Sequence, residues 1–215
     1  EEHVDWQAVI QATQAKLPLM ENPRRDSRKD LKIWVARNDD SFSFIYAEHI
    51  DLLRSMGQVT FFDPEKDQDI PADIDFLYLP GGYPEKHVDE LVAAKQTRAS
   101  IKQYIENGGK ALAECGGMIY LAQGIVGDDD NCYPMAGVLP FKISMRKQDR
   151  KLSLGYRRFV LDGKEYRGHE FHYTQFLGEV PPTATQVYNA KGDPVPTPVI
   201  RYKNVLASYT HLYQI

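Results

Sequence analysis

The chain has 215 residues, of which 42% are hydrophobic and 11% aromatic, so it is long enough to bury one sizeable core. A formal net charge of −4 leaves no general basic field, which argues against nucleic acid as a partner. The sequence has neither a run of 18 apolar residues nor a signal peptide, so we expect no membrane association and no secretion.

The two cysteines, Cys115 and Cys132, are too few for a disulfide scaffold, and they lack the C-x-x-C spacing of a metal site. We therefore expect a reducing, cytoplasmic location and no metal site in this chain.

The first 30 residues differ from the rest. A short helical pattern is interrupted by Pro18, Pro23 and a charged run, and the chain opens on Glu1 instead of Met. We expect residues 1–30 to be a linker or the tail of a preceding domain that is absent here, and residues 31–215 to form one domain.

Between residues 31 and 114, strand patterns alternate with helical ones. The predicted elements are, in chain order, a strand at 31–36, a helix at 44–56, strands at 59–62 and 76–79, helices at 83–94 and 97–107, and a strand at 110–114. This alternation implies right-handed βαβ units, in which helices cover both faces of an open, mostly parallel sheet. The predicted fold class is α/β.

The second half of the chain has short segments rich in Val, Tyr and Phe, separated by Gly, Pro or Asp. Strands are predicted at 137–143, 152–161, 165–173, 185–189, 198–201 and 205–209. Asp162-Gly163 is typical of a hairpin turn. We expect this strand-rich half to close around the same sheet.

Cys115 stands where the apolar strand at 110–114 stops and a helical pattern opens on Gly116 and Gly117. A strand, a sharp turn with a nucleophile at its tip, and a helix form a nucleophile elbow. The unpaired N–H that follows the cysteine can stabilise a thiolate and a developing oxyanion. The alternative is that Cys115 is an inert, small apolar residue at the end of a buried strand.

Gly81 and Gly82 follow the strand at 76–79, at the edge where ligands bind in open α/β sheets. Glycine lets the backbone approach a ligand closely, so this turn is a candidate half of an oxyanion hole, unless it is only a tight turn. It is not a nucleotide-binding loop, because the chain contains no G-x-x-x-x-G-K-[ST] motif.

A cysteine nucleophile needs a base, and His211 is the candidate because it ends the predicted last strand. The alternative is a terminal histidine that faces solvent. His49 and His87 are expected at the surface or at a boundary. In R-G-H-E-F-H-Y, strand alternation places Glu170 and His172 on one face.

The motifs G-G-Y-P-E at 81–85, A-E-C-G-G at 113–117 and S-Y-T-H at 208–211 occur in this order. With them, residues 31–215 resemble the class I, or triad, glutamine amidotransferase domain, which has a flavodoxin-like fold. L-G-Y-R at 154–157 and R-G-H-E-F-H at 167–172 resemble the cobyrinic acid a,c-diamide synthase subgroup in particular.

The resemblance implies that Cys115 attacks the side-chain amide of L-glutamine, forms a thioester and releases ammonia, with His211 as the base. It places glutamine and the oxyanion against Gly81, Gly82, Tyr83, Gly116 and Gly117. The ammonia would amidate the a- and c-carboxylates of cobyrinic acid in cobalamin biosynthesis. The partner would be an N-terminal synthase domain of the same polypeptide, which holds ATP and Mg²⁺ and most of the contacts to the corrinoid; this chain itself would carry no cofactor.

The sequence departs from the wider family at the third triad residue. The common H-x-E ending is missing, since Leu212 and Tyr213 follow His211. Glu170 is the tentative candidate for orienting His211, and a backbone carbonyl is the alternative. The gap also leaves open a non-catalytic binding domain of this fold, or a cysteine hydrolase with another substrate. A related synthase that amidates cobyric acid, hydrogenobyrinic acid or nickel-sirohydrochlorin is a further alternative.

Overall fold

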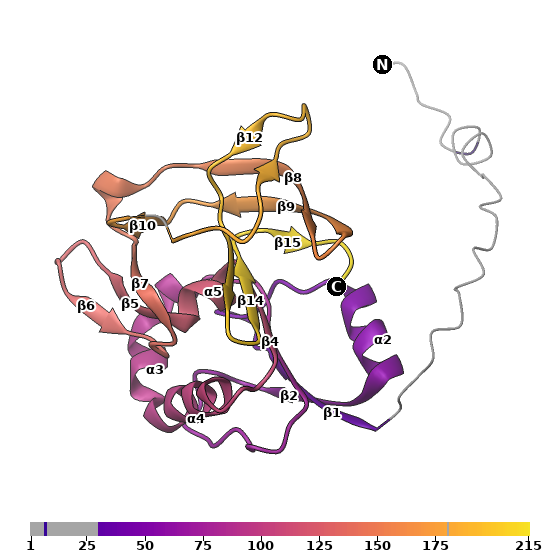
Figure 1. Cartoon of the computed structure of the whole chain (residues 1–215). Coiled ribbons are helices and arrows are strands. Elements are labelled where there is room, and N and C mark those ends of the chain that lie inside the picture. Colours follow the sequence, from indigo (N-terminus) through magenta and orange to yellow (C-terminus); the bar gives the residue numbers. More distant parts are fainter. Residues whose placement is uncertain (1–6, 8–29, 180) are drawn as a thin grey trace.

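The structure is a computed structural model that describes Gln7, residues 30–179 and residues 181–215 (Figure 1). Except for Gln7 and Asp30, the linker predicted at 1–30 lies outside the described residues. The central sheet has six strands, in the order β13 (Val199–Tyr202), β14 (Val205–Ser208), β4 (Ala111–Glu114), β3 (Phe76–Leu79), β1 (Leu31–Ala36) and β2 (Gly57–Phe62). All neighbouring pairs are parallel except β13 with β14, which confirms the mostly parallel sheet.

Two hydrophobic layers cover the central sheet, because successive strand residues point to opposite faces. Leu77 and Leu79 pack with α3 (Val88–Ala93), α4 (Lys95–Glu106) and α5 (Gly116–Leu121). Tyr78 packs on the other face with α2 (Ala47–Met56) and with strands of a second sheet. Helices therefore lie on both faces, as predicted, but one face is shared with strands.

Of the second half, β13 and β14 join the central sheet as expected, whereas its other strands in the described residues form two further sheets. A four-stranded sheet has the order β10 (Gln175–Leu177), β7 (Leu139–Ser144), β5 (Ala122–Val126) and β6 (Cys132–Pro134). A five-stranded sheet has the order β12 (Pro194–Val195), β11 (Val187–Tyr188), β8 (Ser153–Leu161), β9 (Lys164–His172) and β15 (His211–Leu212). Phe159 and Leu161 of β8 pack in the same buried cluster as Tyr78 of the central sheet, so the five-stranded sheet covers one face of the central sheet.

Several element boundaries differ from the predictions for local reasons. The first helix begins at Ala47 instead of 44, because Phe44 pairs its backbone with Gly81. The helix predicted at 83–94 is divided into a 3-10 turn, η1 (Pro84–Lys86), and α3; a second 3-10 turn, η2 (Lys147–Asp149), precedes β8. The hairpin turn at Asp162-Gly163 is confirmed, with φ angles of 51° and 79°.

The chain changes sheets just before its end. It leaves the central sheet after Ser208 and joins the five-stranded sheet at His211, so His211 does not end the predicted strand but begins β15. The crossing lies tightly on β9. A Cβ atom on Gly168 would stand 2.0 Å from the carbonyl oxygen of His211, so only glycine fits there.

Gly168→Ala should lower the free energy of unfolding by about 3 kcal/mol, because the added methyl group pushes against backbone that has no free space. Gly192→Ala is the matched control, since nothing lies within 4 Å of its Cβ position and only its left-handed φ of 88° is strained. That strain should cost about 1 kcal/mol. Urea unfolding measures both; equal losses would contradict the tight crossing.

Candidate active site

The elbow predicted at Cys115 is present in the backbone. Cys115 links β4 to α5 with φ 46° and ψ −103°, a conformation that non-glycine residues rarely adopt. Its N–H donates to the carbonyl of Ser208 at 2.7 Å, and α5 lies so close to β3 that a Cβ on Gly117 would stand 2.0 Å from the carbonyl oxygen of Leu79. Backbone strain of this kind costs roughly 1–3 kcal/mol and is concentrated at functional sites.

Two glycine turns meet at the carboxyl ends of β3 and β4. A Cβ on Gly116 would stand 2.9 Å from the nitrogen and 2.8 Å from the oxygen of Gly82, so the two turns touch through their backbones. A Cβ on Gly81 would stand 2.2 Å from Cε1 and 2.7 Å from Nδ1 of His211. The absence of a side chain at Gly81 therefore makes room for the imidazole of His211. The sequence predicted Gly81 only as part of an oxyanion hole. Through these contacts the structure brings the neighbourhoods of Cys115 and His211 together.

Aromatic rings hold the imidazole of His211. It stacks on His169 at a centroid distance of 4.8 Å, and Phe44 meets it edge-on at 4.6 Å. His169 is itself fixed by Tyr46, whose hydroxyl lies 3.0 Å from Nδ1 of His169. Nδ1 of His211 is buried and has no hydrogen-bond partner among the described residues. Burial, together with the nearby His169 and His172, lowers the pKa of His211 to about 3.

Glu170 is buried, but its hydrogen bonds lead elsewhere. It accepts hydrogen bonds from Ser153 at 2.8 Å, Arg157 at 2.5 Å, His172 at 2.6 Å and Thr197 at 2.7 Å. Burial alone would raise the pKa of Glu170, but the hydrogen bonds from His172 and Thr197 lower it to about 2. No hydrogen bond joins it to His211 within the described part of the chain. Its role as the orienting acid stays a prediction without a direct contact.

Cys115 is buried, and its thiol is neutral. Burial raises the pKa of the Cys115 thiol well above its usual range, and the carboxylate of Glu85 raises it further. The N–H of Gly116 acts in the opposite direction, because its hydrogen bond lowers this pKa. Because the pKa of His211 lies near 3, the thiol and the imidazole are both uncharged at pH 7. The site therefore holds a neutral pair instead of a thiolate and an imidazolium.

Two acidic residues at the site were not singled out from the sequence. Oε2 of Glu85 is buried and has no partner among the described residues, and burial raises the pKa of Glu85. Glu114 precedes Cys115 and is 3% exposed; burial raises its pKa to about 7. A carboxylate at the end of an apolar strand, as in A-L-A-E, is the signal that would have found Glu114.

The placement of His49 corrects a prediction. It was expected at the surface or a boundary but is 1% exposed, with Nδ1 3.0 Å from the hydroxyl of Tyr78. The helix that carries His49 is covered by the layer that contains β15, and no local sequence pattern predicted that β15 lies on this helix.

Tyr83 is 41% exposed, and its ring lies under the ammonium group of Lys86.

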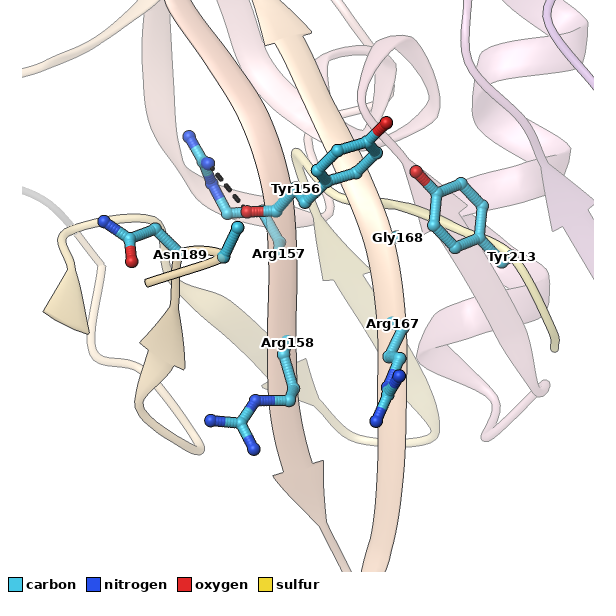
Figure 2. A pocket seen from close by; sticks show the side chains of 8 residues that line it. Tyr156, Arg157, Arg158, Arg167, Gly168, Asn189 and Tyr213 are labelled. Atoms are coloured by element: carbon cyan, nitrogen blue, oxygen red, sulfur yellow. Dashed lines mark hydrogen bonds between the residues drawn. The ribbon is translucent and has the colours of Figure 1, made fainter. Parts of the chain in front are cut away.

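Two pockets are lined in part by strands of the five-stranded sheet, and neither is lined by Cys115 or His211. One, of about 340 Å³, is bordered by Glu170, His172 and Tyr209. The other, of about 390 Å³, lies over the β8–β9 hairpin; in Figure 2, Arg158 and Arg167 extend from neighbouring strands along one side of it. No group of three or more His, Cys, Asp or Glu residues suited to a metal ion occurs in the described ranges. Within the same ranges, no helix has the length and apolar character needed to cross a membrane.

Comparison with known proteins places the chain in a family. The CobB/CobQ-like glutamine amidotransferase domain matches residues 32–214. The chain is 36% identical to a cobyrinate a,c-diamide synthase of Priestia megaterium over 88% of this chain and 42% of that protein. It is 37% identical to a hydrogenobyrinate a,c-diamide synthase of Pseudomonas aeruginosa over 89% of this chain and 43% of that protein. The chain thus spans less than half the length of these relatives.

A solved glutamine amidotransferase from Thermotoga maritima has the same fold, with a TM-score of 0.53 and 17% identity over 84% of this chain and 75% of that one. At this identity the likeness concerns the fold alone. The family match and the two relatives together give the assignment: the chain belongs to the CobB/CobQ-like family of glutamine amidotransferase domains.

Proposed function

We propose that this chain is the glutaminase part of a longer synthase, in which Cys115 and His211 release ammonia from L-glutamine. The observation that carries the proposal is the convergence of a strained cysteine elbow, two touching glycine turns and a buried imidazole at one end of the central sheet. A parallel sheet binds its ligands at this end.

The first step is proton transfer within the neutral pair. His211 takes the proton from the Cys115 thiol as the sulfur attacks the side-chain carbonyl carbon of glutamine. The backbone N–H groups of Gly116 and of Gly82 or Tyr83 hold the oxyanion, and the loss of one such donor costs on the order of 3 kcal/mol in the barrier. His211 then gives the proton to the departing nitrogen. Ammonia leaves, and water hydrolyses the thioester to glutamate.

Glu85 is suited to the α-ammonium group of glutamine. Its buried Oε2 has no partner among the described residues, and its carboxylate adds to the effect of burial in raising the pKa of the Cys115 thiol. A buried carboxylate oxygen without a partner costs free energy that a bound cation offsets. We propose that glutamine supplies this cation through its amino group.

The ammonia acceptor is proposed from the relatives. Their names point to the a- and c-carboxylates of cobyrinic or hydrogenobyrinic acid. ATP and Mg²⁺ would act on the part of the protein outside this chain, and we assign no step with them to residues of this chain. Phe44, Tyr156 and Tyr213 are exposed around the site, and we propose that they contact that part. The missing acid of the H-x-E motif supports a second candidate, a non-catalytic binding domain.

A diazo-ketone analogue of glutamine should label Cys115 covalently, with the loss of glutaminase activity, because the thiol is the only proposed nucleophile. Cys115→Ala should abolish both labelling and hydrolysis, while Cys132→Ala, which removes the exposed cysteine, should change neither. His211→Ala should slow hydrolysis roughly 100-fold or more. Mass spectrometry of the labelled peptide and an ammonia assay measure these outcomes. Equal, near-zero rates for H211A and the wild type would favour the binding domain, whereas an active wild type with an equally active H211A would contradict the role of His211 as the base.

The pH dependence of kcat/KM should lack the acid limb of an ordinary histidine. The base acts as the neutral imidazole, and a pKa near 3 keeps His211 neutral far below pH 6. From pH 7.5 to 5.5 the value should therefore stay nearly constant, whereas a histidine with the usual pKa of about 6.5 would lose roughly 10-fold. Steady-state glutaminase rates test this, and a limb centred near pH 6.5 would contradict the buried, neutral base.

A further inference from the structure

A single buried carboxylate joins the segment that carries the nucleophile to the segment that carries the base. Glu114 directly precedes Cys115, and its Oε1 accepts a hydrogen bond from the N–H of Leu212 at 3.1 Å. Leu212 directly follows His211. Glu114 and Leu212 lie 98 positions apart in sequence and on different sheets, so their hydrogen bond bridges the two halves of the site.

The N–H of Leu212 has no strand to bond to. β15 is the edge of the five-stranded sheet and pairs with β9 on one side only. On that side the N–H of Tyr213 donates to the carbonyl of Arg167 at 2.9 Å. Successive N–H groups of a strand point to opposite edges, so the N–H of Leu212 points to the open edge. There the carboxylate of Glu114 takes the place of a neighbouring strand.

The second oxygen of Glu114 is held from the opposite side. The hydroxyl of Tyr78 donates to Oε2 at 2.8 Å, and Nδ1 of His49 lies 3.0 Å from the same hydroxyl. All three side chains are buried. Both oxygens therefore have fixed directions, and the carboxylate cannot turn away from Leu212 without breaking a second buried hydrogen bond.

A carboxylate at this place is costly for the fold. Its neighbours on the same face include the apolar Leu112 and Leu212, and burial raises the pKa of Glu114 to about 7. Buried carboxyl groups are uncommon unless they bind a partner. An apolar residue would fill the space, but it would leave the N–H of Leu212 without an acceptor.

We propose that Glu114 is a positioning residue of the glutaminase, which clasps β15 to the end of β4 and so fixes the imidazole of His211 relative to the thiol of Cys115. It acts through backbone, since none of its hydrogen bonds within the described ranges reaches the imidazole. In this chain, which lacks the acid of the H-x-E motif, the acid that precedes the nucleophile sets the place of the base. The inference rests on the proposed function of Cys115 and His211.

A matched pair of substitutions separates the effect of the length of the Glu114 side chain from the effect of its charge. Glu114→Gln keeps the length and lets an amide oxygen accept from Leu212, whereas Glu114→Asp keeps the charge but is one carbon too short. We expect E114Q to retain kcat within about 3-fold and E114D to lose on the order of 10- to 100-fold, with KM for glutamine unchanged in both, because misplacement by about 1 Å costs this much. The labelling rate of Cys115 by the diazo-ketone should follow kcat.

Thermal unfolding of each variant separates a displaced base from an unfolded chain. E114D that is folded and as active as the wild type, or less impaired than E114Q, would overturn the inference. If E114D does not fold, E114Q decides. A kcat within about 3-fold of the wild type supports the proposed role of the Glu114–Leu212 hydrogen bond, and a loss of 10-fold or more in folded E114Q overturns it. Glutaminase activity that survives in C115A would instead refute the proposed function.

Discussion

A side chain on Gly81, Gly82 or Gly116 would fill the place where the site is assembled. Neighbouring strands of a sheet lie about 4.8 Å apart, so the turns that leave β3 and β4 must share a narrow space. Glycine lets them touch through backbone, and it leaves room for the imidazole of His211 beside Gly81. The elbow, the amide donors and the base all depend on this contact between turns without side chains.

The charges of the site follow from its burial. The raised pKa of the Cys115 thiol and the lowered pKa of His211 keep both groups neutral, so the reactive thiolate forms only when the proton is transferred. In place of an acid, stacking on His169 and the edge contact with Phe44 hold the ring of His211. Packing of this kind fixes the position of a ring without stabilising a positive charge on it. This fits a base that takes up a proton only briefly.

The local signals in the sequence were enough for the parallel core and for the elbow. The strands at 31–36 and 76–79 were placed correctly, because apolar runs bounded by turn residues are strong signals. The two additional sheets were not predicted, since no local pattern says which strands pair over long distances. For the same reason His49 was misplaced and the contacts of Gly81 and Glu114 were missed. Each depends on β15, whose partner β9 lies about forty residues earlier in the chain.

Because the chain changes sheets between Ser208 and His211, the two reactive side chains are held by different sheets. The thiol follows a strand of the central sheet and the imidazole lies on the five-stranded sheet, so the distance between the reacting atoms depends on how these two sheets are placed relative to each other. The hydrogen bond from the N–H of Leu212 to Glu114 joins the two layers and so limits how far this separation can change.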